Sequence, residues 1–279
     1  MITKKQIINF IYKNNIQDSV VCLHSSLKSF GKVENGAKDI IDAFLESGCT
    51  LVCPAFFYDS ATLPQKKYKQ NAMNFESIKS DKISLYFPSI SYEELPKQID
   101  KSMGIIPRTL LTYSKTLRTK NPMNSFCVNG PKSDLIVNGN FTNIINNVYS
   151  AHFVYKNIFH DVNLKAFILL AGVDFTSCTP LHFAEEISGK KPFRRWAVYH
   201  SNIVETEQGS CSDGFENLRP LLQDLEIKDK VGKCEIRLYE FNKFILKSAQ
   251  IILQNPTLTI CKDFCERCKC MAQGGFLKE

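Results

Sequence analysis

The chain has 279 residues, of which 44% are hydrophobic, and a mean hydropathy of −0.16. These are values of an ordinary globular protein that can bury a sizeable core. No apolar run approaches the roughly 20 residues of a membrane-spanning helix, and the first residues lack a signal peptide's apolar core, so we expect a cytoplasmic protein without a membrane partner. The net charge of +7 is spread out, which argues against a nucleic-acid partner and suits a phosphorylated small ligand.

Helices and strands alternate in the first part of the chain. Apolar residues recur on one face of residues 3–14, which predicts a helix, and a short buried strand follows at 19–23. A second helix begins after Asn35, its N-cap, and stops at Gly48, and a second buried strand occupies residues 49–57. This order is typical of layered α/β proteins.

Residues 59–102 are polar and irregular. A stretch of this length inside a compact domain is usually functional or mobile. We interpret it as an insertion that faces the substrate, with a disordered excursion as the alternative. Beyond it, the pattern predicts a helix at 105–113, a strand at 125–130 and a helix at 150–159.

The remaining elements complete the predicted fold. They are a buried strand at 165–172, a helix at 179–189, an antiparallel pair at 194–200 and 202–207, a helix at 213–225, a strand at 233–241 and a helix at 242–254. No repeat or linker divides the chain. We therefore expect one α/β domain over residues 1–260, with a mixed central sheet flanked by helices, and a cysteine-rich tail over 261–279.

One histidine stands where a strand gives way to a helix. Thr179 can cap this helix and Pro180 fits its first position, so that His182 lies in the first turn. Glu185 and Glu186 follow three and four residues later. The helix N-terminus lowers a histidine pKa and a nearby carboxylate raises it, which suits a general base, whereas a purely structural histidine is the alternative.

Two earlier segments also carry polar groups at strand or helix ends. Ser25 and Ser26 follow the first strand, where hydroxyls and backbone amides can hold a phosphate or a pantetheine amide, although serines here are also common in ordinary turns. Met103 precedes a predicted helix, and Arg118 precedes an Asn-Pro turn. This arginine can pair with a cofactor phosphate or remain solvated in its loop.

In this order, the three segments resemble the aminoglycoside 3-N-acetyltransferase family. HSSLKSFG and the GAKDIIDAFLESGCTLVCPAF that follows resemble the family's cofactor loop, helix and strand. The segments MGIIPRTL and LRTKNPMNSF resemble its Met-Gly and Arg-Ser-x-His-Pro-x-x-Ser segment. GVDFTSCTPLHFAEE resembles its Gly-x6-Thr-x-x-His-x-x-Glu motif. The resemblance extends over nearly the whole chain.

The resemblance implies transfer of an acetyl group from acetyl-CoA to an amine of an aminoglycoside or another amino sugar. It implies that His182 is the general base and that Glu185 orients it. Residues that match the acetyl-CoA cleft are Ser25, Ser26, Leu27, Met103 and Ser125, and we add Arg118 as a phosphate ligand. The residues expected to face the substrate are Asp59, Asp174 and Thr179.

Departures from the family pattern concern the substrate more than the reaction. Asn121 replaces the histidine before proline, Thr119 replaces serine, and Pro107 stands where an acidic residue is common. The insertion is rich in lysine, whereas a polycationic antibiotic favours an acidic pocket. A biosynthetic amino sugar therefore competes with an antibiotic as the acceptor. A non-catalytic CoA- or sugar-binding homologue is the alternative function, and a homodimer is left open.

The tail gathers four of the 11 cysteines, Cys261, Cys265, Cys268 and Cys270. Four thiols in ten residues can bind zinc or an iron–sulfur cluster, which would make a metal- or redox-responsive protein a further alternative. The spacing C-x3-C-x2-C-x-C is not that of a standard finger, and such crowded ligands seldom complete one tetrahedral site. We therefore expect no metal, but reduced thiols, or a disulfide formed during purification.

Overall fold

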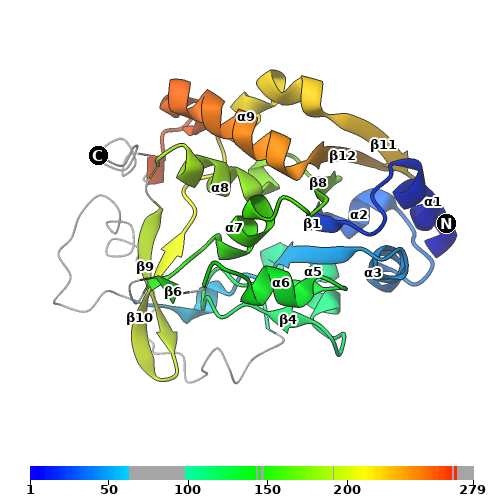
Figure 1. Cartoon of the computed structure of the whole chain (residues 1–279), viewed down its shortest axis with the longest axis horizontal. Coiled ribbons are helices and arrows are strands. Elements are labelled where there is room, and N and C mark those ends of the chain that lie inside the picture. The colour runs from blue at the N-terminus through cyan, green and yellow to red at the C-terminus, as the bar shows by residue number, and fades with distance from the viewer. Residues whose placement is uncertain (63–97, 143, 146–147, 191, 266, 269–279) are drawn as a thin grey trace.

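The computed structural model in Figure 1 describes residues 1–62, 98–142, 144–145, 148–190, 192–265 and 267–268. Most of the predicted insertion and Cys270 lie outside the described residues. Within the described part of the chain, no helix combines the length and the apolar character needed to cross a bilayer.

A mixed sheet of seven strands forms the centre of the fold, in the order β11-β12-β8-β1-β2-β5-β4. Strand β1 pairs in parallel with β2 and β8, and the four outer strands add in antiparallel pairs. The strands are β1 Val20–Ser25, β2 Thr50–Pro54, β4 Leu117–Arg118, β5 Phe126–Asn129, β8 Ala166–Ala171, β11 Ile227–Val231 and β12 Cys234–Glu240. The predicted α/β fold with a mixed central sheet is confirmed.

Both faces of this sheet are buried under helices. Side chains alternate along β1, so that Val21 and Leu23 pack into one apolar cluster while Val20 and Cys22 pack into the other. The first cluster is closed by α1 Lys4–Lys13, α3 Ala37–Glu46 and α5 Ile105–Leu110, with the short α2 Leu27–Phe30 beside them. The second is closed by α6 Ser133–Asn138, α7 Phe153–His160, α8 Pro180–Ile187 and α9 Phe241–Gln254. The parallel strands therefore end in a layer covered on both sides, where loops converge.

A second, smaller sheet has the strand order β3-β9-β10-β7-β6. Its strands are β3 Ala61–Thr62, β6 Ile144–Ile145, β7 Val148–Tyr149, β9 Phe193–Tyr199 and β10 Asn202–Gln208. The predicted antiparallel pair is its central hairpin, which Figure 1 shows reaching away from the seven-stranded sheet. The pairing of β9 with β3 and of β10 with β7 joins residues far apart in sequence, and the local pattern did not predict it.

Two expectations about helices were wrong in detail. The predicted helix over 213–225 is a 3₁₀ segment, η4 Phe215–Leu225, and Pro220 inside it lacks the N–H that an α-helix requires. Gly36, not Asn35, caps α3, while the backbone and side-chain nitrogens of Asn35 donate to Asp39. Four further short 3₁₀ segments are η1 Tyr58–Ser60, η2 Lys101–Met103, η3 Phe175–Ser177 and η5 Pro256–Thr259.

Candidate active site

A cavity of about 410 Å³ opens where the central strands end. Ser25 at the end of β1, Pro54 at the end of β2 and Val173 just after β8 line it. Loops and helix starts supply the remaining walls, which include His152 and His182. This is the position at which open α/β sheets usually bind their ligands.

His182 and Glu185 form a hydrogen-bonded pair on α8. The Nδ1 atom of His182 lies 2.9 Å from Oε2 of Glu185, one helical turn further on. When Nδ1 carries the proton and donates it to this carboxylate, Nε2 of His182 is left with a free lone pair. The pair therefore has the arrangement of a general base whose ring is oriented by a carboxylate.

Two further side chains hold the Glu185 carboxylate in place. Nζ of Lys190 donates to its Oε1 atom over 2.8 Å, and Oγ of Ser210 donates to Oε2 over 2.8 Å. Lys190 also donates to Oγ1 of Thr259, near the end of the described chain. The carboxylate that orients His182 is thus tied to the loop after β10 and to the C-terminal segment.

Burial keeps the histidine neutral. Desolvation lowers the pKa of His182 below its ordinary value, and the interaction with Glu185 only partly offsets this. For Glu185, burial favours the neutral acid, but Lys190 and His182 outweigh it and lower its pKa to about 2. At neutral pH the pair is an uncharged imidazole beside a carboxylate, the state that can accept a proton.

A second histidine–carboxylate pair lies beside the first. Nδ1 of His152 is 3.0 Å from Oε2 of Glu186, and Lys156 approaches the other oxygen of that carboxylate at 2.6 Å. The rings of His152 and His182 stack with their centroids 6.4 Å apart. Sequence reasoning had singled out Glu186 but missed His152, because nothing near residue 152 resembles a motif and only the tertiary fold joins the two segments.

The remaining predicted cofactor residues fall into two groups. Ser25 and Met103 line the cavity, whereas Ser26 caps α2 and Leu27 packs against the core beneath it. Arg118 and Ser125 instead bind one backbone carbonyl: Nη2 of Arg118 and Oγ of Ser125 lie 2.9 and 2.5 Å from the oxygen of Ala55. Neither of these two is among the residues that line the cavity.

Of the three predicted substrate residues, only Thr179 lines the cavity. Asp174 caps the 3₁₀ segment η3 by accepting from the backbone of Thr176, and Asp59 is exposed in η1. The departure at Asn121 is structural, since its fully buried side chain binds the backbone oxygens of Tyr149 and Ser150. It therefore leaves the cavity wall unchanged.

His24 and Arg267 also line the cavity and were missed from the sequence. Burial lowers the pKa of His24 to about 3, so its imidazole is neutral. Its Nε2 atom is buried without a hydrogen-bond partner among the described residues. An unpaired polar atom of this kind is costly unless a ligand or a water pairs with it.

Gly209 limits the space beside His182. A Cβ atom added to this glycine would lie 2.5 Å from Cδ2 and 2.9 Å from Nε2 of the imidazole. Gly209→Ala should therefore push the ring from its position and lower kcat between about 10- and 10²-fold, because small misplacements of a catalytic group are costly. Steady-state kinetics would check this, with the KM for the acetyl donor and the melting temperature as controls. A variant with wild-type kcat would show that the ring position is not critical.

The model of the aminoglycoside 3-N-acetyltransferase family matches residues 22–251 of this chain. The chain belongs to that family. Its match contains the cavity residues from Leu23 to Ser212, although not Arg267. Among curated proteins, none matches the sequence of this chain.

Solved structures of the family share the fold. The apoenzyme of aminoglycoside acetyltransferase AAC(3)-IVa is 18% identical, with a TM-score of 0.71 over 97% of both chains. YokD from Bacillus subtilis is 20% identical, with a TM-score of 0.70 over 91% of this chain and 94% of its own. AAC-IIIb in a binary complex with CoASH is 15% identical, with a TM-score of 0.66 over 90% and 96%. At these identities the similarity shows the fold alone.

Proposed function

We propose that this protein is an acetyl-CoA-dependent N-acetyltransferase that acetylates an amine of an amino sugar or aminoglycoside by direct transfer. Membership of the family gives the reaction class, and the pairing of a buried, neutral His182 with Glu185 at the cavity is the observation that carries the mechanism. The same pair would have no task in a homologue that only bound CoA or a sugar.

The proposed reaction has one nucleophilic step. The acceptor amine attacks the thioester carbonyl, a C–N bond forms, and the amine proton passes to Nε2 of His182. Glu185 stabilises the imidazolium that results, as a carboxylate hydrogen-bonded to Nδ1 can. The C–S bond then breaks, the leaving CoA thiolate takes up a proton, and N-acetyl product and CoA are released.

Several cavity groups suit acetyl-CoA. Hydroxyls of Ser25, Ser102 and Thr176 can donate to the amide carbonyls of pantetheine, and the unpaired Nε2 of His24 can accept from an amide N–H. Arg267 adds positive charge at the same wall. The structure of AAC-IIIb with CoASH supports this assignment for a protein of the same fold.

The charge of the cavity favours an acceptor with few amines. Among the described residues that line it there is no aspartate or glutamate, whereas Arg267 is present. Mutants of AAC(3)-IVa have been solved in complex with a gentamicin and with apramycin, so aminoglycosides remain candidate acceptors here. We place a less cationic amino sugar first, because each like-charge contact in solvent costs a polycation about 1 kcal/mol.

The test is a CoA-release assay across aminoglycosides and nucleotide-linked amino sugars. We expect acceptor-dependent release, with kcat/KM higher for an amino sugar carrying one amine than for a polycationic aminoglycoside. An aminoglycoside kcat/KM of about 10⁴ M⁻¹s⁻¹ or above, exceeding that of every amino sugar, would reverse the order of acceptors. Tight CoA binding without turnover of any amine would instead favour the non-catalytic homologue.

A further inference from the structure

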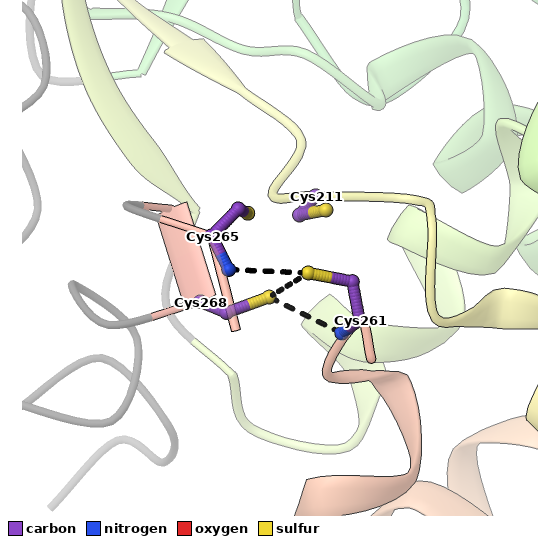
Figure 2. A group of neighbouring side chains, drawn as sticks. All are labelled: Cys211, Cys261, Cys265 and Cys268. Carbon is purple, nitrogen blue, oxygen red and sulfur yellow. Dashed lines mark hydrogen bonds between the residues drawn. The ribbon is translucent and has the colours of Figure 1, made fainter. Parts of the chain in front are cut away.

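Four cysteines from two distant segments meet beside the active site. Cys211 follows β10, and Cys261, Cys265 and Cys268 belong to the C-terminal segment. All four sulfur atoms lie within 4.8 Å of one another, and Figure 2 shows the side chains converging from the two segments. Three of these cysteines belong to the predicted tail cluster, and Cys211 adds a fourth sulfur that the spacing of the tail did not reveal.

The distances suit a single metal ion. A tetrahedral zinc site with Zn–S bonds of about 2.3 Å holds its sulfurs about 3.8 Å apart. The sulfurs of Cys261 and Cys268 are 3.5 Å apart, far beyond the disulfide length of about 2.05 Å. An iron–sulfur cluster shares its cysteines among several irons, which spaces their sulfurs more widely than the ligands of one ion.

The surroundings of the sulfurs also suit thiolates. The backbone N–H groups of Cys261 and Cys265 donate to the sulfurs of Cys268 and Cys261, each over 3.3 Å. Such donors stabilise sulfur that carries negative charge. Cys211, Cys261 and Cys268 are buried, and beside them in this small apolar cluster lie only Cys265 and Ile260 among the described residues. Apolar packing alone gives little reason for four thiols to gather here.

We propose that Cys211, Cys261, Cys265 and Cys268 bind one Zn²⁺ as four thiolates in a closed structural site. Binding would replace four S–H bonds by Zn–S bonds and release the protons. The expectation of a metal-free protein came from the tail cysteines alone, whose crowded spacing does not readily complete a tetrahedron. With Cys211 as the fourth ligand, the site joins two segments and has the donor set that zinc prefers.

The position of the site gives it a structural consequence. Ser210, which donates to Glu185, directly precedes Cys211. Thr259, which accepts from Lys190, lies two residues before Cys261, and Arg267 of the cavity wall directly precedes Cys268. A metal at these sulfurs would fasten the C-terminal segment to the loop that supports the His182–Glu185 pair.

Elemental analysis of protein purified in reducing buffer, without added metal, tests the proposal. We expect about one zinc per chain in the wild type and in Cys49→Ser, a buried control whose sulfur binds only the backbone oxygen of Ile16 among the contacts described. Cys211→Ser and Cys268→Ser should lose the zinc. A zinc chelator should lower the melting temperature of the wild type by about 5 °C or more and leave metal-free variants unchanged.

Three results would overturn the proposal: wild-type protein without zinc, iron with acid-labile sulfide in its place, or a disulfide among these cysteines in the freshly reduced protein. If the serine variants fail to fold, the metal content of the wild type and its response to the chelator still decide. None of these measurements depends on acetyl transfer, so they remain separate from the test of the proposed function.

Discussion

Replacing His182 by alanine is expected to lower the rate of acetyl transfer by on the order of 10²-fold or more. The imidazole pairs with Glu185 at 2.9 Å and lines the cavity, and among the described residues the other group on the same Glu185 oxygen is the hydroxyl of Ser210, which is no base at neutral pH. The loss should appear in kcat, while acetyl-CoA binding stays close to that of the wild type because the alanine removes no phosphate or pantetheine donor.

His160→Ala is the matched control for this change. His160 lies at the exposed end of α7, outside the cavity, and its ring stacks on Phe141. Its removal should leave kcat within about two-fold of the wild type, as for most surface changes. Comparable turnover by His182→Ala and the wild type, both folded and both binding acetyl-CoA, would remove His182 from the role of base.

Glu185→Gln is expected to lower kcat by less than His182→Ala and to move the acid limb of the pH profile to lower pH. Transfer requires neutral His182, so the rate falls as pH drops through the pKa of that group. Burial lowers this pKa and Glu185 raises it, so loss of the carboxylate leaves a still lower pKa and a weaker base. The measurement is kcat against pH for both proteins with the same acceptor.

Glu186→Gln provides the comparison. It removes an equivalent carboxylate from His152 rather than from His182, so the acid limb should stay in place. Glu185→Gln also leaves Lys190 buried without its carboxylate partner, a change that can cost about 3–5 kcal/mol of stability, so both variants need melting curves. If the acid limb is unchanged in Glu185→Gln and shifts in Glu186→Gln, the roles assigned to the two carboxylates are wrong.

The parts of this account that depend on local pattern could be predicted. Strand β8 followed by a turn and an amphipathic helix is encoded in adjacent residues, and the i, i+3 spacing of His182 and Glu185 brings them together on any α-helix. The antiparallel pair β9–β10 follows from its alternation. That residues 1–260 form one domain separate from the tail stays a prediction.

The parts that depend on long-range contacts could not be predicted. His152 meets Glu186 across 34 residues, and Cys211 meets Cys261 across 50, since no periodicity links such segments. Arg118 shows the converse error. Its sequence position suggested a phosphate ligand, but in the fold its guanidinium reaches the carbonyl of Ala55, because β4 runs beside β5 at the edge of the central sheet.

The central claim is that neutral His182 takes a proton from an amine as the acetyl group passes directly to it from acetyl-CoA. A single-turnover experiment with labelled acetyl-CoA and a reactive amino-sugar acceptor, quenched at intervals and analysed for labelled product and labelled protein, tests it most directly. The account predicts that label moves to the amine in the wild type without passing through the protein, and that His182→Ala binds the donor but slows the transfer. Label accumulating on the protein before the product appears, or undiminished transfer by the variant, would contradict it.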